Sequence, residues 1–380
     1  MKLFYIANAR IPTEKAHGIQ IMKMCEAFVK CGLEVELIIP KRRNPIKEDV
    51  FKYYGIETRF AIKTIFSLDL LGIKHIERLA LYIQALTFAF SVLFYSLLNY
   101  KKFRRSILYF RDEFSPWLLS VFYKNTFLEI HAFGNRFNYY KQLFSKISGF
   151  VLITQKAELE FLKLGVAKEK ILTAPDGVDL EKFNLNLSKE QARERLNLPL
   201  GKKLIIYSGH LYNWKGVGDL AESSKYLPED YLIIFVGGVR NDAREFSAIH
   251  KDNKKIIIEG QKHYHQIPIY LKAADVLVLS NKTGSDLSMK YTSPLKMFEY
   301  MASKRPIIAT DLPSIREVLS ESNAVIVKPD NPEDLARGIK KVLVGDKLSA
   351  EIAGRAYEDA KNYTWEKRAE RILEFINNRL

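Results

Sequence analysis

The stretch SPLKMFEYMASKRPIIATD (residues 293–311) places an amphipathic helix directly before an apolar strand. One acid, Glu299, lies on the apolar side of this helix, beside Leu295, Phe298, Met301 and Ala302. The strand that follows has no polar alternation, which is typical of a parallel sheet covered by helices on both faces. The stretch therefore indicates an α/β fold, and it raises the question of what the carboxylate of Glu299 binds.

The same alternation of apolar strands and helices continues along the whole chain, which predicts parallel sheets wound by crossover helices. Because 380 residues exceed the usual size of one hydrophobic core, two domains are expected. Each half has six apolar runs, so the prediction is two Rossmann-like domains. These runs lie at 2–8, 34–40, 106–110, 126–132, 149–154, 170–175, 203–209, 231–238, 255–260, 275–280, 305–310 and 324–329.

The net charge of +15 is concentrated in the first half of the chain. Residues 1–175 hold 27 Lys and Arg against 15 Asp and Glu, whereas residues 176–380 hold 32 against 29. A solvated basic face, an anionic membrane surface or phosphorylated acceptor, and nucleic acid are the three interpretations. We expect no nucleic acid, because no zinc-finger, RNP-type or helix-turn-helix motif is present.

Cysteine content and the N-terminus bear on the compartment. The two cysteines, Cys25 and Cys31, lie six apart in one predicted helix, where they would not pair, so a reducing compartment is expected. The opening MKLFYIANARIP is interpreted as a strand and not as a signal peptide. Residues 79–98 are long and apolar enough to span a bilayer. A span would split the first sheet, so we expect a buried or membrane-facing helix.

Two glycine-containing loops follow predicted strands and precede helices. In the first domain, His17 and Gly18 lie where a helix begins, and such a junction suits a phosphate or a sugar hydroxyl, although it is also ordinary turn chemistry. In the second, Gly209 and His210 follow a strand and Lys215 precedes a helix. A lysine there points a cation at the carboxyl ends of the strands, where open parallel sheets bind ligands, or it is a surface lysine.

Glu299 has two interpretations. A buried acid is costly unless it is paired, so it could form a salt bridge with Lys296, lie at the helix edge or bond to backbone. Alternatively, its carboxylate could accept hydrogen bonds from the ribose of a nucleotide, with the helix start near Ser293 facing the phosphates.

Four ordered blocks resemble the family-four retaining glycosyltransferases of the GT-B fold, the glycosyl transferases group 1. The blocks are residues 151–183, 205–217, 258–281 and 292–319. The resemblance implies two Rossmann-like domains with parallel sheets facing each other across a cleft. We expect an acceptor domain at 1–177, a donor domain at 178–357, and a helix at about 358–380 that packs back on the first domain.

The resemblance also implies roles for individual residues. Lys215 would bind the donor diphosphate, Glu299 the ribose, and the backbone at Ser293, Pro294, Leu295 and Lys296 the phosphates. His131, in LEIHAF, matches a histidine placed near the transferred sugar; by itself it would be a satisfied structural histidine. Further substrate contacts are expected from His17, Gly18 and His210.

Two departures from the family pattern concern the donor. The family has two glutamates eight positions apart, but Tyr291 stands eight before Glu299, which leaves the identity of the sugar open. An arginine usually stands five before the lysine, and His210 occupies that position, so Lys215 bears more of the diphosphate charge.

The expected reaction moves a sugar from a UDP- or GDP-sugar to a glycan or lipid-linked acceptor, without cofactor or metal. The protein is expected in the cytoplasm, peripheral at the inner face of the cell membrane. Two alternatives remain: a GT-B nucleotide-sugar epimerase, which would turn over donor without acceptor, and a non-enzymatic basic protein that binds membranes or polyanions.

Overall fold

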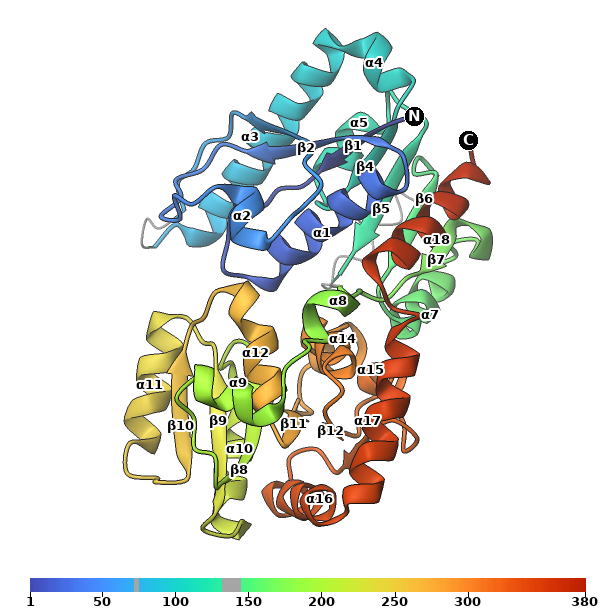
Figure 1. The fold of residues 1–380 in the computed structure, drawn as a ribbon. Coiled ribbons are helices and arrows are strands. Elements are labelled where there is room, and N and C mark those ends of the chain that lie inside the picture. Colours follow the sequence, from blue (N-terminus) through green and yellow to red (C-terminus); the bar gives the residue numbers. More distant parts are fainter. Residues whose placement is uncertain (72–74, 132–144) are drawn as a thin grey trace. The chain divides into compact units, whose positions relative to one another are not determined.

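The computed structural model describes residues 1–71, 75–131 and 145–380 (Figure 1). The chain divides into two compact units. Unit 1 consists of Met1–Pro175 and Trp365–Leu380, and unit 2 of Asp176–Thr364. Each unit contains one sheet whose strand pairs are all parallel, so the expected α/β fold with two parallel sheets is confirmed.

The sheet of unit 1 has seven strands in the order β3-β2-β1-β4-β5-β6-β7. The edge strand β3 was missed in the sequence because its side chains are largely exposed and two of its five residues are polar. The strands are β1 Lys2–Ile6, β2 Glu34–Pro40, β3 Ala61–Ile65, β4 Ile107–Phe110, β5 Thr126–Ile130, β6 Gly149–Leu152 and β7 Ile171–Thr173.

The helices of unit 1 include one from the end of the chain. Helix α18 follows unit 2 in the sequence but belongs to unit 1, where it packs beside α1, as the red and blue ribbons of Figure 1 show. The helices are α1 Ala16–Lys30, α2 Val50–Tyr54, α3 Glu77–Leu98, α4 Tyr100–Arg104, α5 Ser115–Leu119, α7 Gln155–Lys163 and α18 Trp365–Asn377.

The sheet of unit 2 has six strands in the order β10-β9-β8-β11-β12-β13. The chain changes direction across the sheet between β8 and β11, and such a switch point is where open α/β sheets bind ligands. The strands are β8 Lys203–Ser208, β9 Tyr231–Val236, β10 Ile256–Gly260, β11 Val276–Leu279, β12 Ile307–Thr310 and β13 Val325–Val327.

Helices cover both faces of this sheet. Side chains of β8 alternate between two cores: Leu204 and Ile206 pack with α12, α14 and α17, and Ile205 and Tyr207 pack with α10 and α16. This explains why β8 is apolar at successive positions. The helices are α8 Leu180–Phe183, α9 Lys189–Arg195, α10 Val217–Ser223, α11 Arg240–His250, α12 Ile267–Ala273, α13 Asp286–Lys290, α14 Leu295–Ala302, α15 Pro313–Arg316, α16 Pro332–Val344 and α17 Asp346–Ala360.

Candidate functional site

The loop that carries Lys215 is fixed to the segment that follows β11. Gly216, the next residue, has a φ of 68°, and a Cβ there would lie 1.6 Å from the carbonyl oxygen of Ser280, so only glycine fits. The hydroxyl of Ser280 donates to the carbonyl oxygen of Lys215 at 3.0 Å. The amide of Lys282 donates to the carbonyl oxygen of Trp214 at 3.0 Å. These contacts hold Lys215 at the switch point between β8 and β11.

Lys215 is partly buried beside two aromatic rings. Its Nζ is 5.3 Å from the ring centroid of Trp214 and 5.9 Å from that of Tyr212. Burial lowers the pKa of Lys215 to about 8. Among the residues that the structure describes, no carboxylate forms an ion pair with this amine. Lys215 is therefore a cation whose counter-anion is not a described side chain of the chain itself.

Lys296, in the first turn of α14, is a second such cation. Its side chain is 7% exposed, and within residues 1–71, 75–131 and 145–380 its Nζ has no hydrogen-bond partner. The amine lies 3.7 Å from the ring centroid of Tyr207. Burial and then the charge of Lys215 hold the pKa of Lys296 well below its usual range, although Glu299 opposes them. Burying an amine nitrogen without a hydrogen-bond partner costs free energy, so the place around Lys296 suits an anion from outside the protein.

The two lysines meet at Gly209, directly after β8. A Cβ on Gly209 would lie 4.0 Å from Nζ of Lys215 and 3.9 Å from Cδ of Lys296. Gly209 has a φ of 126°, which a residue with a side chain rarely adopts. The glycine therefore leaves space beside both lysines at the carboxyl end of the central strand.

The start of α14 adds backbone donors to this place. Pro294 is the N-cap residue, and no side chain caps the helix. The hydroxyl of Ser293 instead accepts a hydrogen bond from the amide of Asp176 at 3.2 Å. The hydroxyl of Tyr300 accepts from the amide of Ser208 at 2.8 Å, which fixes α14 against the end of β8. The first-turn amides, beginning with Leu295, thus carry the positive end of the helix dipole beside Lys296.

Glu299 lies one turn further along α14 and is 6% exposed. Burial raises its pKa to about 7, although a hydrogen bond from Tyr264 and the charge of Lys296 oppose that rise. No ion pair joins Glu299 to Lys296 in the described part of the chain, so the salt-bridge interpretation of the sequence does not hold. The carboxyl group remains near half ionisation at neutral pH, which is unusual for a glutamate.

His210 lies beside the same region, and Tyr291 stands two residues before Ser293 in the sequence. The hydroxyl of Tyr207 donates to the carbonyl oxygen of His210 at 2.7 Å, and the His210 ring stacks on Tyr212 with centroids 4.9 Å apart. Tyr291 is buried and ends α13. The structure therefore brings together, in unit 2, the predicted residues from His210 to Glu299.

In unit 1, the predicted residues lie at the carboxyl edge of the other sheet. His131 directly follows β5, and His17 and Gly18 lie in the first turn of α1. A Cβ on Gly18 would lie 2.2 Å from the hydroxyl of Tyr54, so close packing explains this glycine. Burial and then Arg111 lower the pKa of His17 to about 4, so the ring is neutral at pH 7.

His131 belongs to a buried network centred on Glu129. Its Nε2 lies 2.5 Å from Oε1 of Glu129. Burial and then the charge of Arg111 lower the pKa of His131 to about 3, so the imidazole is neutral. A neutral ring that donates from Nε2 to a carboxylate keeps Nδ1 as an acceptor.

Four residues hold Glu129 besides His131, and none was predicted from the sequence. Burial opposes the charged form of Glu129, but Arg368, His131 and Arg111 outweigh it and keep its pKa well below the usual range. The other bonds to its carboxylate come from Gln20 (2.8 Å), Tyr109 (2.7 Å), Tyr5 (3.4 Å) and Arg368 (2.7 Å). A polar residue at the centre of the apolar run 126–132 was the available signal.

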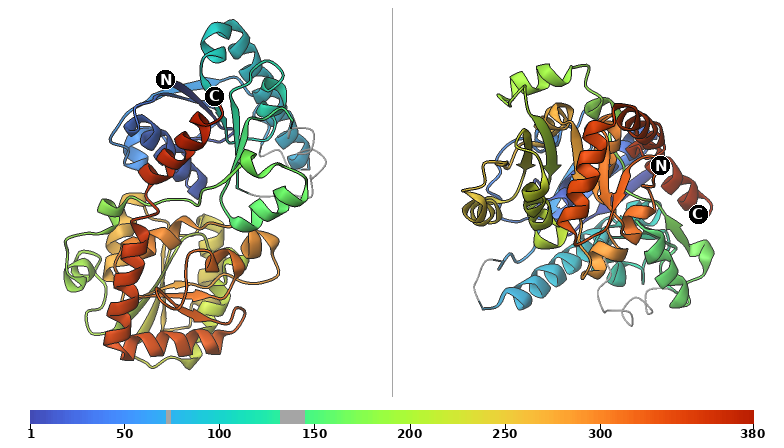
Figure 2. Two further views of the ribbon diagram at one scale, coloured as in Figure 1. Left: turned by 90° about the vertical axis from the view of Figure 1, so that its right-hand side faces the viewer. Right: turned by 90° about the horizontal axis from the view of Figure 1, so that it is seen from below.

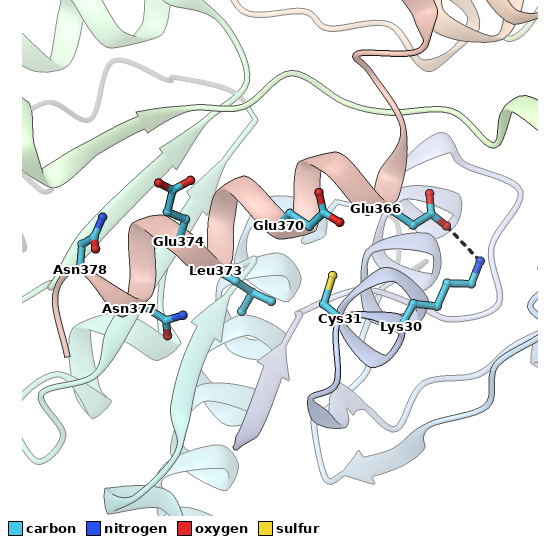
Figure 3. A pocket seen from close by; sticks show the side chains of 8 residues that line it. All are labelled: Lys30, Cys31, Glu366, Glu370, Leu373, Glu374, Asn377 and Asn378. Carbon is cyan, nitrogen blue, oxygen red and sulfur yellow. Dashed lines mark hydrogen bonds and ion pairs between the residues drawn. The ribbon is translucent and has the colours of Figure 1, made fainter.

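A surface pocket lies elsewhere in unit 1, between the end of α1 and α18 (Figure 3). Lys30 pairs with Glu366 across it at 3.0 Å. The other residues that line it are Cys31, Glu370, Leu373, Glu374, Asn377 and Asn378. The pocket contains Cys31 but none of the predicted site residues. It lies between two helices of unit 1, and its lining residues form no group of side chains that suggests a particular ligand.

Comparisons with known proteins agree with this architecture. Anabaena HepE, whose crystal structures contain UDP or UDP-glucose, matches all of both chains with a TM-score of 0.76 at 13% and 14% identity. This fold is GT-B, as expected. Residues 188–359 match the model of the family described as glycosyl transferases group 1. The expected resemblance to this family is therefore confirmed.

Two curated relatives are similar to the chain in sequence. The putative teichuronic acid biosynthesis glycosyltransferase TuaC of Bacillus subtilis is 28% identical over 244 residues, which are 64% of this chain and 59% of TuaC. The N,N'-diacetylbacillosaminyl-diphospho-undecaprenol alpha-1,3-N-acetylgalactosaminyltransferase of Campylobacter jejuni is 26% identical over 248 residues, 63% of this chain and 62% of that enzyme. The similarity thus spans about three fifths of each relative.

Proposed function

We propose that the chain is a retaining glycosyltransferase that moves a sugar from a nucleoside-diphosphate sugar to an acceptor hydroxyl. The observation that carries the proposal is the pair Lys215 and Lys296, which converge at Gly209 with no carboxylate in the described chain paired to either. Two amines and the start of α14 match the charge of a diphosphate.

The chemistry follows from where charge develops. When the bond between the anomeric carbon and the diphosphate breaks, negative charge grows on the leaving oxygen. Lys215, Lys296 and the α14 amides are held in place before the reaction, so they stabilise that charge without reorganisation. We propose that these groups supply the charge without a metal ion. Glu299 would accept hydrogen bonds from the ribose, and Nδ1 of His131 one from a hydroxyl of the transferred sugar.

Relatives favour particular partners. HepE binds UDP and UDP-glucose in its crystal structures, which favours a UDP-sugar over a GDP-sugar as the donor. The name of the Campylobacter enzyme contains a diphospho-undecaprenol acceptor, and TuaC is named for teichuronic acid biosynthesis. We infer a lipid-linked or cell-envelope glycan as the acceptor, and a cytoplasmic enzyme at the inner face of the membrane.

The donor site is tested by thermal unfolding with UDP, GDP and ADP side by side. A ligand at 100 times its dissociation constant stabilises by about 2.7 kcal/mol, which shifts the melting temperature measurably. Lys215→Met should abolish the shift, whereas Lys225→Met, at an exposed lysine of unit 2, should preserve it. If no nucleotide shifts the wild-type chain, the proposed donor site is wrong.

The reaction itself needs a second measurement. The chain should transfer sugar from a UDP-sugar to an undecaprenyl-diphosphate-linked sugar, and NMR of the product should show the donor's anomeric configuration retained. Consumption of the donor without an acceptor would instead indicate an epimerase.

A further inference from the structure

Helix α3 of unit 1 exposes an apolar face that the fold does not cover. Large apolar side chains recur on it every three or four positions, so they form one stripe along the helix. Phe90 is 57% exposed and Phe94 is 65% exposed, although both are aromatic. Figure 2 shows this helix, in light blue, at the periphery of unit 1. The exposed stripe consists of Leu79, Tyr82, Leu86, Phe90, Phe94 and Leu97.

The opposite side of α3 is attached to the sheet of unit 1. Phe88 and Val92 are fully buried. Gln84 donates to the side-chain oxygen of Asn8 at 2.8 Å, and the hydroxyl of Tyr95 donates to Glu36 at 3.0 Å. By length and composition α3 could cross a membrane, but these contacts would have to break for it to do so. The structure therefore indicates a helix that is attached to unit 1 along one side and exposes apolar side chains on the other.

Basic residues follow the stripe directly in the sequence, and the one acid of α3, Glu77, lies at its other end. Between Arg78 and Arg105 the sequence contains no Asp or Glu. Helix α4, which follows directly, is exposed at Lys101 and Arg104, and in the described chain neither of these nor Arg105 forms an ion pair. An apolar face with unpaired cations at its end complements an anionic lipid surface, where both the acyl region and the headgroups find partners.

We propose that the α3 stripe and the cations in and directly after α4 form a docking surface for an anionic lipid bilayer. The stripe would enter the boundary between headgroups and acyl chains, and Lys101, Arg104 and Arg105 would contact the phosphates. This docking surface would bring the enzyme to a lipid-linked acceptor, and it deepens the proposed function in that way. Only the identity of the acceptor rests on the proposed function; the binding to lipid does not.

Binding of the purified full chain to vesicles tests the surface without nucleotide. Co-sedimentation with phosphatidylcholine vesicles is compared with vesicles that also contain phosphatidylglycerol, at low and high salt. The wild-type chain should bind the anionic vesicles more tightly, and salt should weaken the binding. Each basic charge near such a surface is worth about fivefold in binding, so the triple variant K101E/R104E/R105E should lose about 100-fold or more.

Apolar and control variants separate the contributions. The variant F90E/F94E should lose binding to both kinds of vesicle, whereas Ile249→Glu, at an isolated exposed apolar residue of unit 2, should bind as wild type does. All variants should keep the melting shift with UDP, which reports unit 2. Equal binding by F90E/F94E and wild type would overturn the proposal while the donor site stands.

Two other outcomes would also overturn it. If the wild-type chain binds no vesicle but dimerises in sedimentation equilibrium, and F90E/F94E is monomeric, the stripe is an interface between two copies. If vesicle-bound protein resists an alkaline carbonate wash, α3 spans the bilayer and does not dock on it.

Discussion

The guanidinium of Arg368 lies 2.7 Å from the carboxylate of Glu129, and neither side chain has any exposed surface. Arg368 comes from α18, near the end of the chain, and Glu129 comes from β5. The Nε of Arg368 also donates to the carbonyl oxygen of Pro175 at 2.9 Å. The last helix thus supplies the cation that neutralises an acid in the centre of the first sheet, next to His131.

Removing that cation should cost more than an ordinary ion pair. Arg368→Ala leaves Glu129 buried with its main counter-charge gone, so we expect the free energy of unfolding to fall by about 3 to 5 kcal/mol. Urea denaturation measures this fall. The double variant E129Q/R368M should recover much of it, because both charges are then absent.

An exposed pair in the same unit serves as the control. Lys163 and Glu160 lie 3.1 Å apart on α7, and Lys163 is 70% exposed. Lys163→Ala should cost about 0.5 kcal/mol or less. If Arg368→Ala costs no more than this control, the buried pair does not stabilise unit 1.

Lys296 should show a trade-off between stability and binding. Its amine is buried without a hydrogen-bond partner in the described chain, so Lys296→Met should leave the free protein as stable as wild type or more stable. The same change should weaken UDP binding by about 1.5 to 3 kcal/mol, the value of a charge-assisted hydrogen bond. The melting temperature without nucleotide measures the stability, and calorimetry with UDP measures the affinity. A loss of stability with unchanged affinity would mean that Lys296 has a structural role only.

Lys215 should make donor binding depend on pH. Burial lowers its pKa to about 8, and a bound diphosphate favours the protonated amine. Binding at pH 8 to 9 should therefore take up protons, and affinity should fall as pH rises above 8, with this contribution constant below about pH 7. Calorimetry in buffers of different ionisation enthalpy measures the uptake. Lys215→Met should remove this component, and identical uptake in both proteins would contradict the assignment.

Glu299 should make stability depend on pH with the opposite sign from an ordinary surface acid. Its pKa rises from 4.5 unfolded to about 7 folded, so between these values the native state binds more protons, and stability falls as pH rises through the window. Glu299→Gln does not titrate. The unfolding free energy of the variant minus that of wild type should therefore grow by about 3 kcal/mol between pH 4 and pH 8. If this difference in unfolding free energy does not change with pH, the carboxyl group of Glu299 is exposed to solvent.

Much of the fold could be predicted from the sequence, because a continuous apolar run is typical of a strand that helices cover on both faces of the sheet. The strand β3 was not predicted, because it is an edge strand with exposed side chains. In unit 2 the predicted residues meet because loops after parallel strands share one sheet edge, so strand order hardly matters to the prediction. Their roles stay predictions until the donor is tested.

The network of Glu129 could not be predicted in the same way. Arg368 stands in an amphipathic, charged helix, where an arginine is expected at the surface. Only the packing of α18 beside α1 shows that this one faces inward. Likewise, the low pKa of Lys215 depends on how deeply its neighbours bury it, which no spacing of residues reveals.

The return of α18 to unit 1 sets an order of events during synthesis. Glu129 and Arg368 are 239 positions apart, so at about 5 to 20 residues per second the acid leaves the ribosome roughly 10 to 50 s before its cation. Throughout that interval the nascent first sheet holds an acid without its main counter-charge. Unit 2 is contiguous in sequence and can finish folding first, and unit 1, although it begins the chain, is completed last.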